Sequence, residues 1–166
     1  TEYSNTRNQI KKTLDALIKI KMNTIMIWPN PDAGSEFLSK EIRTYRENFS
    51  TNDFLHLFTN LPPEIFTKLM CKCACMVGNS SSAIRDGEAL GVPAVNIGTR
   101  QQGRVRGQNV IDVGYSTTQI VDAVRKQLEV GSYDSKQLYG DGYAGKRISD
   151  VLTDIEIKDI QKKITY

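Results

Sequence analysis

The sequence contains no apolar run long enough to span a bilayer and no signal-peptide pattern. Its net charge is only +3, and it has no basic face with interleaved aromatic residues. A surface that binds nucleic acid or membrane would need a larger excess of positive charge. We therefore expect a cytoplasmic globular protein that binds neither. At 166 residues, the chain is long enough for one domain with a full hydrophobic core.

Metal ligands are also scarce. The chain has one histidine, His56, and three cysteines, Cys71, Cys73 and Cys75, which alternate over five residues. Alternate residues of one strand point the same way, which suits neither a local disulfide nor a tetrahedral site with four ligands. The sequence therefore predicts reduced, partly buried thiols, with no metal and no cofactor.

Segments with helical and strand-like patterns alternate along the chain. Ile10, Leu14 and Leu17 recur at helical spacing, whereas "TIMIW" is typical of a short buried strand that ends at Pro29. The patterns predict helices over about 5–20, 34–47, 64–71, from the serines 80–82 to 90, 117–129 and 144–152, and strands over 24–28, 54–58, 74–79, 94–98 and 109–113.

This alternation predicts an α/β fold, a Rossmann-like doubly wound parallel sheet with helices on both faces. We expect residues 1–152 to form that domain and residues 153–166 to form a charged amphipathic tail. In such sheets, ligands bind beyond the carboxyl ends of the strands. Three loops fall there: "PNPDAGS", "TNLPPE" and "GNSSS". Their convergence predicts one binding site.

The three serines Ser80, Ser81 and Ser82 follow a predicted strand and begin a predicted helix. The first N–H groups of a helix are unpaired and its dipole end is positive, so serine hydroxyls there suit a phosphate. The alternative is a helix cap, which needs only one serine. The stretch is not a P-loop, because it lacks the glycine spacing and the Lys-Ser/Thr pair.

Other candidates lie around the same edge. Arg100 follows the strand 94–98 and could bind a phosphate through two hydrogen bonds, although "RQQGRVR" could also be a solvated basic loop. Asp86 could accept hydrogen bonds from sugar hydroxyls, but a solvated acid is the simpler interpretation. Asn30 could be a turn residue or a ligand contact. Phe66, after Pro62-Pro63, could face a flat base, but its spacing is more typical of a core residue.

Joined motifs give a more specific indication. The stretch "GNSSSAIRDGEALGVPAVNIGTRQQGR…NVIDV", with "PNPDAGS" upstream and "YGDGYAGKRI" downstream, resembles the C-terminal half of the hydrolysing UDP-N-acetylglucosamine 2-epimerases. It is most similar to the branch that makes N-acetylmannosamine for sialic-acid-type sugars. The likeness extends from "TLDALI" (13–18) to about Ile148. It implies a GT-B-type architecture of two Rossmann-like halves, with the nucleotide sugar in the cleft between them.

The resemblance also implies roles. In that family the reaction removes the proton at C2, expels UDP, and adds water to give N-acetylmannosamine. The acid and base carboxylates belong to the N-terminal half, so we expect no catalytic residue here and no turnover by this chain alone. The implied partners are UDP-N-acetylglucosamine or UDP and the N-terminal Rossmann-like half. The implied contacts are Ser80, Ser81 and Arg100 to the nucleotide's diphosphate end, Asp86 (usually a glutamate) to the ribose, Leu61 and Phe66 beside the uracil, and Asn30 at the site.

Two other functions fit the same residues. A glycosyltransferase of the same two-domain architecture would have a similar nucleotide site, because fold does not fix the reaction. A non-catalytic nucleotide-binding module would need the anion site alone. The resemblance implies that the cleft-facing edge packs against the other half of the enzyme. Where that edge is uncovered, its apolar surface and the tail from about Thr153 predict association of copies into a homo-oligomer.

Overall fold

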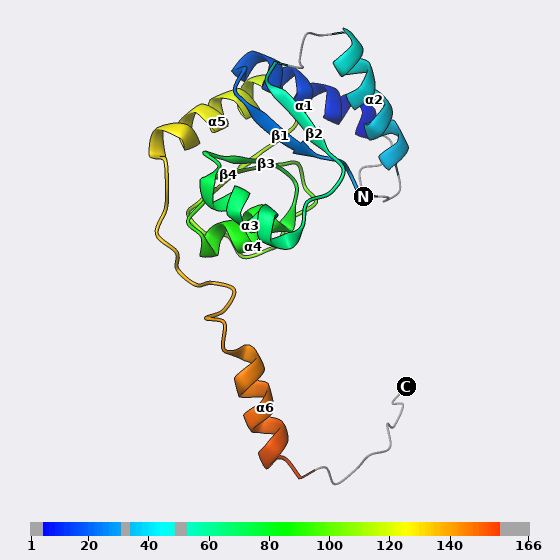
Figure 1. Ribbon diagram of the computed structural model, residues 1–166. Helices are drawn as coiled ribbons and strands as arrows, with labels where there is room; N and C mark the ends of the chain where they lie inside the picture. Colours follow the sequence, from blue (N-terminus) through cyan, green and yellow to red (C-terminus); the bar gives the residue numbers. More distant parts are fainter. Residues whose placement is uncertain (1–4, 31–33, 49–52, 157–166) are drawn as a thin grey trace, which may run out of the picture.

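The computed structural model describes residues 5–30, 34–48 and 53–156, in which helices and strands alternate (Figure 1). Each predicted helix and strand forms, with bounds that differ by a few residues at most. The helices are α1 (Thr6–Ile20), α2 (Ser35–Asn48), α3 (Pro63–Lys72), α4 (Ser81–Ala89), α5 (Thr117–Val130) and α6 (Ala144–Asp154), and the strands are β1 (Thr24–Ile27), β2 (Leu55–Phe58), β3 (Met76–Gly78), β4 (Ala94–Ile97) and β5 (Val110–Val113).

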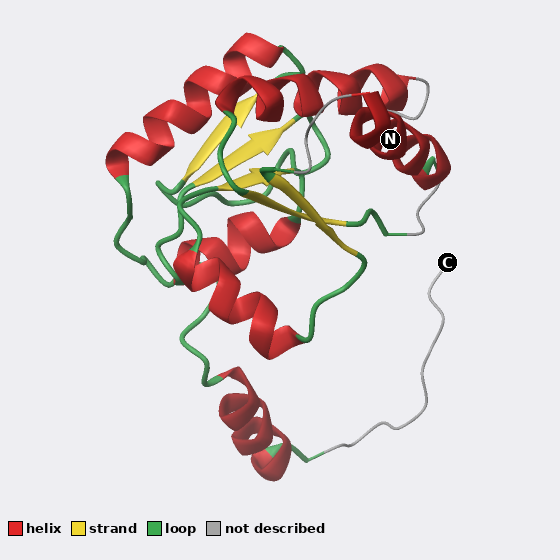
Figure 2. Ribbon diagram, turned by 45° about the horizontal axis from the view of Figure 1, so that its top comes forward, coloured by secondary structure: helices red, strands yellow, loops and turns green. Residues whose placement is uncertain are grey.

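All strand pairs are parallel, and helices lie on two sides of the strands. Helices α1, α2 and α5 lie on one side, and α3 and α4 lie on the other (Figures 1 and 2). The predicted α/β class is therefore confirmed. The expectation of one sheet is corrected, because the hydrogen-bonded ladders form two sheets, β1-β2 and β3-β4-β5.

Strand β1 is not the buried strand that its apolar sequence predicts. Ile25 and Ile27 are 43% and 37% exposed, whereas Thr24 and Met26 are half-buried. Met26 packs against the core beneath α1 and α2, so only one face of β1 is covered. The run "TIMI" therefore follows the two-residue alternation of a half-covered strand.

Helix α1 contributes to two hydrophobic clusters. Leu14 and Leu17 pack with residues of α2 and of the β2 region, including Ile42 and Leu55. Ala16, on a neighbouring face of the same helix, packs in the cluster formed by β4 and α5. One helix thus joins the cores of the two sheets into a single packed body.

A buried glutamine connects α5 to the three-stranded sheet. Gln127 is fully buried, and its Nε2 donates to the backbone oxygens of Ala94, at 2.7 Å, and Asn109, at 2.8 Å. Its Oε1 accepts a 2.6 Å hydrogen bond from the hydroxyl of Tyr133. Because every polar atom of this amide group is bonded, burial adds no unpaired polar group to the core.

Helix α4 ends as its sequence predicts, at a glycine. Gly91 has φ +67°, its N–H bonds to the Glu88 oxygen (3.1 Å), and the Val92 N–H bonds to the Gly87 oxygen (2.8 Å). These two bonds define a Schellman motif, which favours glycine at the left-handed position. The backbone oxygen of Tyr133 also lies only 2.0 Å from where a Cβ of residue 91 would stand.

Replacing Gly91 with alanine should therefore lower the free energy of unfolding by roughly 2–4 kcal/mol, from left-handed strain plus the clash. Gly131 is the matched control, because it has φ +80° and open space around its Cβ position. Gly131→Ala lacks a clash and should cost less, about 1–2 kcal/mol, from its backbone conformation alone (φ 80°, ψ −49°). Urea denaturation of both variants checks this, and equal losses would contradict the clash with Tyr133.

The segment after α5 is held to the body by a buried acid. Glu88 is 3% exposed, and its carboxylate accepts hydrogen bonds from the backbone N–H groups of Lys136 (2.6 Å) and Leu138 (3.2 Å). Beyond these two hydrogen bonds, α6 projects away from the body and has no buried residue (Figure 1). The helix continues to Asp154, two residues into the expected tail, and residues 157–166 of that tail lie outside the described part.

The three cysteines do not share a strand, in keeping with the predicted helix over 64–71 and strand over 74–79. Cys71 belongs to α3, Cys73 ends that helix, and Cys75 lies in the connection before β3. All are free thiols, and burial raises the pKa of Cys75 to about 12. Among the residues that the structure describes, no group of three or more His, Cys, Asp or Glu side chains could hold a metal ion. None of the described helices has the length and apolar character needed to cross a membrane.

Candidate functional site

The serines at the end of β3 form a capped helix start, here called the serine turn (residues 79–82). Ser80 is the N-cap of α4, with φ −75° and ψ 139°, and its Oγ accepts a 3.3 Å hydrogen bond from the Ser82 N–H. The capping interpretation therefore holds for Ser80. Its hydroxyl proton is still able to donate, and Ser81 and Ser82 add two further hydroxyls in the first helical turn. The capped start thus retains donors suited to an anion.

There is open space beside Gly78, the residue directly before the serine turn. Gly78, the last residue of β3, has φ +144°, and no described atom lies within 4 Å of the position that a Cβ would occupy. A glycine without neighbours at a strand end permits close approach of a ligand to the backbone. The positive end of the α4 dipole starts two residues later.

Arg100 belongs to the loop after β4, here called the arginine loop (residues 98–107). The neighbouring Gln101 is 4% exposed, and its Nε2 donates a 2.8 Å hydrogen bond to the backbone oxygen of Asn79 in the serine turn. Arg100 itself is exposed. The structure therefore places the arginine loop against the serine turn, as expected for residues that share a site at one sheet edge.

The remaining candidates occupy less connected positions. Asp86 is exposed in the second turn of α4, four residues after Ser82. Asn30 is exposed beyond β1, and Leu61 is half-buried beyond β2. Phe66 is half-buried in the first turn of α3, neither fully core nor fully exposed. The hydrogen bonds that join the serine turn to the arginine loop do not reach these last three residues.

Sequence reasoning missed the polar residues behind the site. Arg106, in the same basic stretch "RQQGRVR" as Arg100, has its guanidinium bonded to protein acceptors, including the Gln101 backbone oxygen at 2.8 Å. Gln101 gave no signal, because a glutamine in a basic loop is usually solvated. Glu88 could have been found, since Ala83, Ile84 and Gly87 place position 88 on the buried side of α4.

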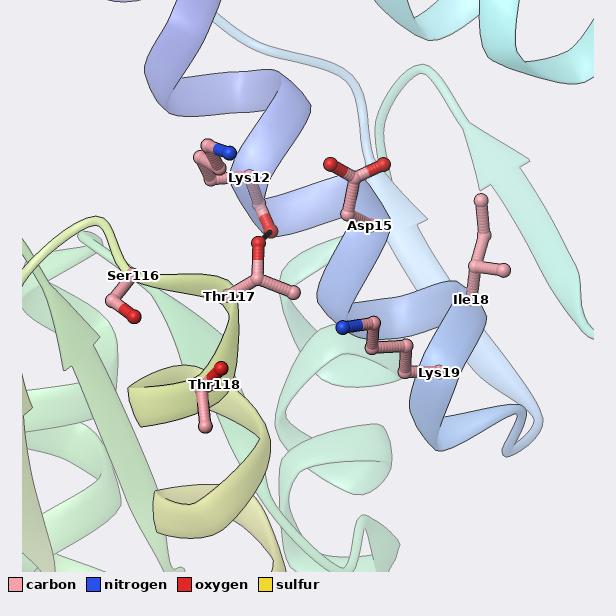
Figure 3. A pocket seen from close by; sticks show the side chains of 7 residues that line it. All are labelled: Lys12, Asp15, Ile18, Lys19, Ser116, Thr117 and Thr118. Carbon is pink, nitrogen blue, oxygen red and sulfur yellow. Dashed lines mark hydrogen bonds between the residues drawn. The ribbon is translucent and has the colours of Figure 1, made fainter.

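A separate pocket of about 520 Å³ lies between α1 and the start of α5 (Figure 3). Thr117 Oγ1 donates a 3.2 Å hydrogen bond to the Lys12 backbone oxygen at its edge. None of the seven residues predicted for nucleotide binding lines this pocket, so it is distinct from the serine turn. Its lining residues are Lys12, Asp15, Ile18, Lys19, Ser116, Thr117 and Thr118.

Several known proteins similar to this chain are described as 2-epimerases of nucleotide sugars. A family model for UDP-N-acetylglucosamine 2-epimerase matches residues 1–153. The chain is 33% identical over 120 residues to a UDP-N-acetylglucosamine 2-epimerase of Neisseria meningitidis serogroup B, covering 72% of this chain and 30% of that protein. It is 28% identical over 156 residues to the UDP-N,N'-diacetylbacillosamine 2-epimerase (hydrolyzing) of Legionella pneumophila, covering 94% of this chain and 40% of that protein.

A solved structure has the same fold. The crystal structure of Methanocaldococcus jannaschii UDP-GlcNAc 2-epimerase in complex with UDP-GlcNAc and UDP matches with a TM-score of 0.65 and 17% sequence identity. The match covers 91% of this chain and 42% of that one. It confirms the predicted fold class as one part of a GT-B-type architecture. The chain thus spans less than half the length of each of these similar proteins.

Proposed function

The chain belongs to the UDP-N-acetylglucosamine 2-epimerase family, and from that membership we propose that it is the UDP-binding half of a hydrolysing epimerase. The complete enzyme releases UDP and N-acetylmannosamine from UDP-N-acetylglucosamine, in the branch that supplies sialic-acid-type sugars. The observation that carries the proposal is the contact between the arginine loop and the serine turn, made by Gln101 and Asn79. It brings the loop that carries Arg100 against a helix start. The Methanocaldococcus jannaschii relative was solved in complex with UDP-GlcNAc and UDP, which supports UDP as the ligand.

The proposed chemistry of this half is stabilisation of the leaving group. Expelling UDP requires negative charge to grow on the diphosphate as the C1–O bond breaks. A helix start contributes about 0.3–1 kcal/mol to an exposed anion and up to ~2 kcal/mol in a sheltered geometry. Hydroxyls of Ser80 and Ser81 and the guanidinium of Arg100 add charge-assisted hydrogen bonds. Together they favour departure of UDP.

The other proposed contacts select the nucleoside. Asp86 accepts hydrogen bonds from the ribose hydroxyls, with a side chain one methylene shorter than the glutamate usual in the family. Leu61 and Phe66 border the uracil, and both are half-buried, so they retain apolar surface for a flat base. Asn30 adds a polar contact beyond β1. These assignments extend the site from the phosphates towards the base.

Proton transfer at C2 belongs to the remainder of the enzyme. General acid–base groups must lie within hydrogen-bond reach of the proton that they move. We assign them to the N-terminal Rossmann-like half, which closes the cleft opposite the serine turn. This chain alone therefore binds uridine nucleotide and does not turn over.

Product analysis of the full-length protein tests the proposal. With UDP-N-acetylglucosamine and no acceptor, it should release free UDP and free N-acetylmannosamine in equal amounts. UDP should bind more tightly than uridine or ADP. A requirement for a sugar or lipid acceptor would instead indicate a glycosyltransferase. Binding without any turnover by the full-length protein would indicate a non-catalytic module.

A further inference from the structure

Arg106 has a different function from Arg100. Its Nε donates to Asp112 Oδ2 (2.5 Å), its Nη1 to the Arg104 backbone oxygen (2.6 Å), and its Nη2 to the Gln101 backbone oxygen (2.8 Å). All three guanidinium nitrogens thus donate to protein acceptors. The planar, rigid fork of arginine suits this combination of acceptors, which a lysine ammonium cannot reproduce.

The acceptor on the sheet is itself held in place. Asp112, on β5, accepts at Oδ1 a 2.6 Å hydrogen bond from Nδ2 of Asn96, which is 1% exposed on β4. The Asp112 side chain is 48% exposed and that of Arg106 is 22% exposed, so their ion pair by itself adds little stability. The importance of the pair is geometric, because it anchors Arg106 to a rigid strand.

The same chain of bonds continues to the anion site. Arg106 bonds to the backbone of Gln101, and the side chain of Gln101 bonds to the backbone of Asn79, directly before the N-cap Ser80. The arginine loop also has short-range backbone bonds, from Gln102 N to Thr99 O (2.8 Å) and from Arg104 N to Gln101 O (3.3 Å). Its first residue, Gly98, bonds through its N–H to the Val113 oxygen on β5 (2.9 Å), and the Tyr139 hydroxyl donates to the Val105 oxygen. Of these bonds, the one from the Gln101 side chain joins the loop to the serine turn, and Arg106 holds the backbone of that same residue.

We propose that Arg106 is a positioning residue, which with Asp112 and Gln101 fixes the arginine loop so that Arg100 and the serine turn meet one diphosphate. This inference rests on the proposed function. Arg106 acts through the loop and does not touch the ligand. A loop fixed in advance avoids the entropic cost of ordering the loop on binding. A misplacement of about 1 Å can lower a reaction rate by up to about 100-fold, and we expect a loss of affinity of similar size.

Calorimetric titration of UDP into the full-length protein tests this inference. The variants are Arg106→Lys, which keeps the charge but removes the fork, and Asp112→Asn, which removes the anchor. Both should weaken UDP binding by about 10-fold to 100-fold, and the double variant should be no weaker than the weaker single one. The slope of log Kd against log salt should stay unchanged, because no phosphate-contacting charge is lost.

The sign of the Asp112→Asn effect separates the alternatives. If Arg106 contacted the diphosphate directly, removing a neighbouring carboxylate would tighten UDP binding, and Arg106→Lys would largely preserve it. Either result would overturn the inference. If circular dichroism shows that Arg106→Lys does not fold, Gln101→Met tests the same inference. Methionine keeps the buried side-chain volume of Gln101 but loses the hydrogen bond to Asn79.

Arg100→Ala distinguishes this inference from the proposed function. Weaker binding in Arg100→Ala together with wild-type binding in Arg106→Lys and Asp112→Asn would overturn only the positioning role. Wild-type binding in Arg100→Ala, or no UDP binding by the unaltered protein at millimolar concentration, would overturn the proposed function and the positioning role together.

Discussion

Replacing Arg100 with alanine should lower kcat/KM for UDP-N-acetylglucosamine by about 100-fold to 1,000-fold in the full-length protein. The guanidinium is proposed to meet the diphosphate where charge grows as UDP leaves. Because that charge is largest in the transition state, kcat should fall nearly as far as kcat/KM. Steady-state kinetics with detection of released UDP measures both constants.

Arg125→Ala is the matched control for Arg100→Ala. Arg125 is exposed on α5, so its replacement changes the net charge equally while leaving the arginine loop intact. Its kinetics should match those of the unaltered protein. A rise in KM with kcat unchanged in Arg100→Ala would mean that Arg100 binds substrate and transition state equally. Unchanged kinetics in both variants would remove Arg100 from the site.

Replacing the buried Gln127 with leucine should lower the free energy of unfolding by about 3 kcal/mol, although leucine has a similar volume. The change removes both donors to the backbone oxygens of Ala94 and Asn109 and the acceptor for Tyr133. The Asn109 oxygen keeps the Ala94 N–H as a donor (2.7 Å), so the expected loss is that of three hydrogen bonds at about 1 kcal/mol each. Urea denaturation followed by circular dichroism gives the value.

Tyr133→Phe measures one bond of this set separately. It removes only the hydroxyl that donates to Gln127 Oε1, so it should cost about 1 kcal/mol. In the double variant the two losses should not add, because both include the same bond. A loss below about 0.5 kcal/mol for Gln127→Leu would mean that its three hydrogen bonds add no net stability, and that the glutamine is dispensable.

The sequence predicted features that depend on local chemistry. The helix end at residue 90 was predicted because a glycine follows at 91 and a proline at 93, and neither favours continuation of a helix. The serine turn was found because unpaired N–H groups at a helix start follow from helical geometry alone. Arg100 was placed at the same edge because parallel strands carry their following loops to one side.

Features that depend on distant partners were not predictable in the same way. Gln101 is buried because its partner is Asn79, 22 residues earlier, and no local pattern encodes that distance. The division into two sheets depends on which strands pair, and the exposure of Ile25 depends on what covers β1. An apolar tetrapeptide is compatible with either a buried or a half-covered strand, so composition could not decide between them.

Helix α6 lies outside the cooperative unfolding unit of the body. An isolated helix of 11 residues is only marginally stable in water, and none of its side chains is buried to add stability. Hydrogen exchange should therefore be slow for the amides of Lys136 and Leu138, which Glu88 binds, and fast throughout α6. The cooperative unfolding transition in denaturant should then involve a unit that ends near Leu138. The m-value of that transition should correspond to this unit and not to the full chain length.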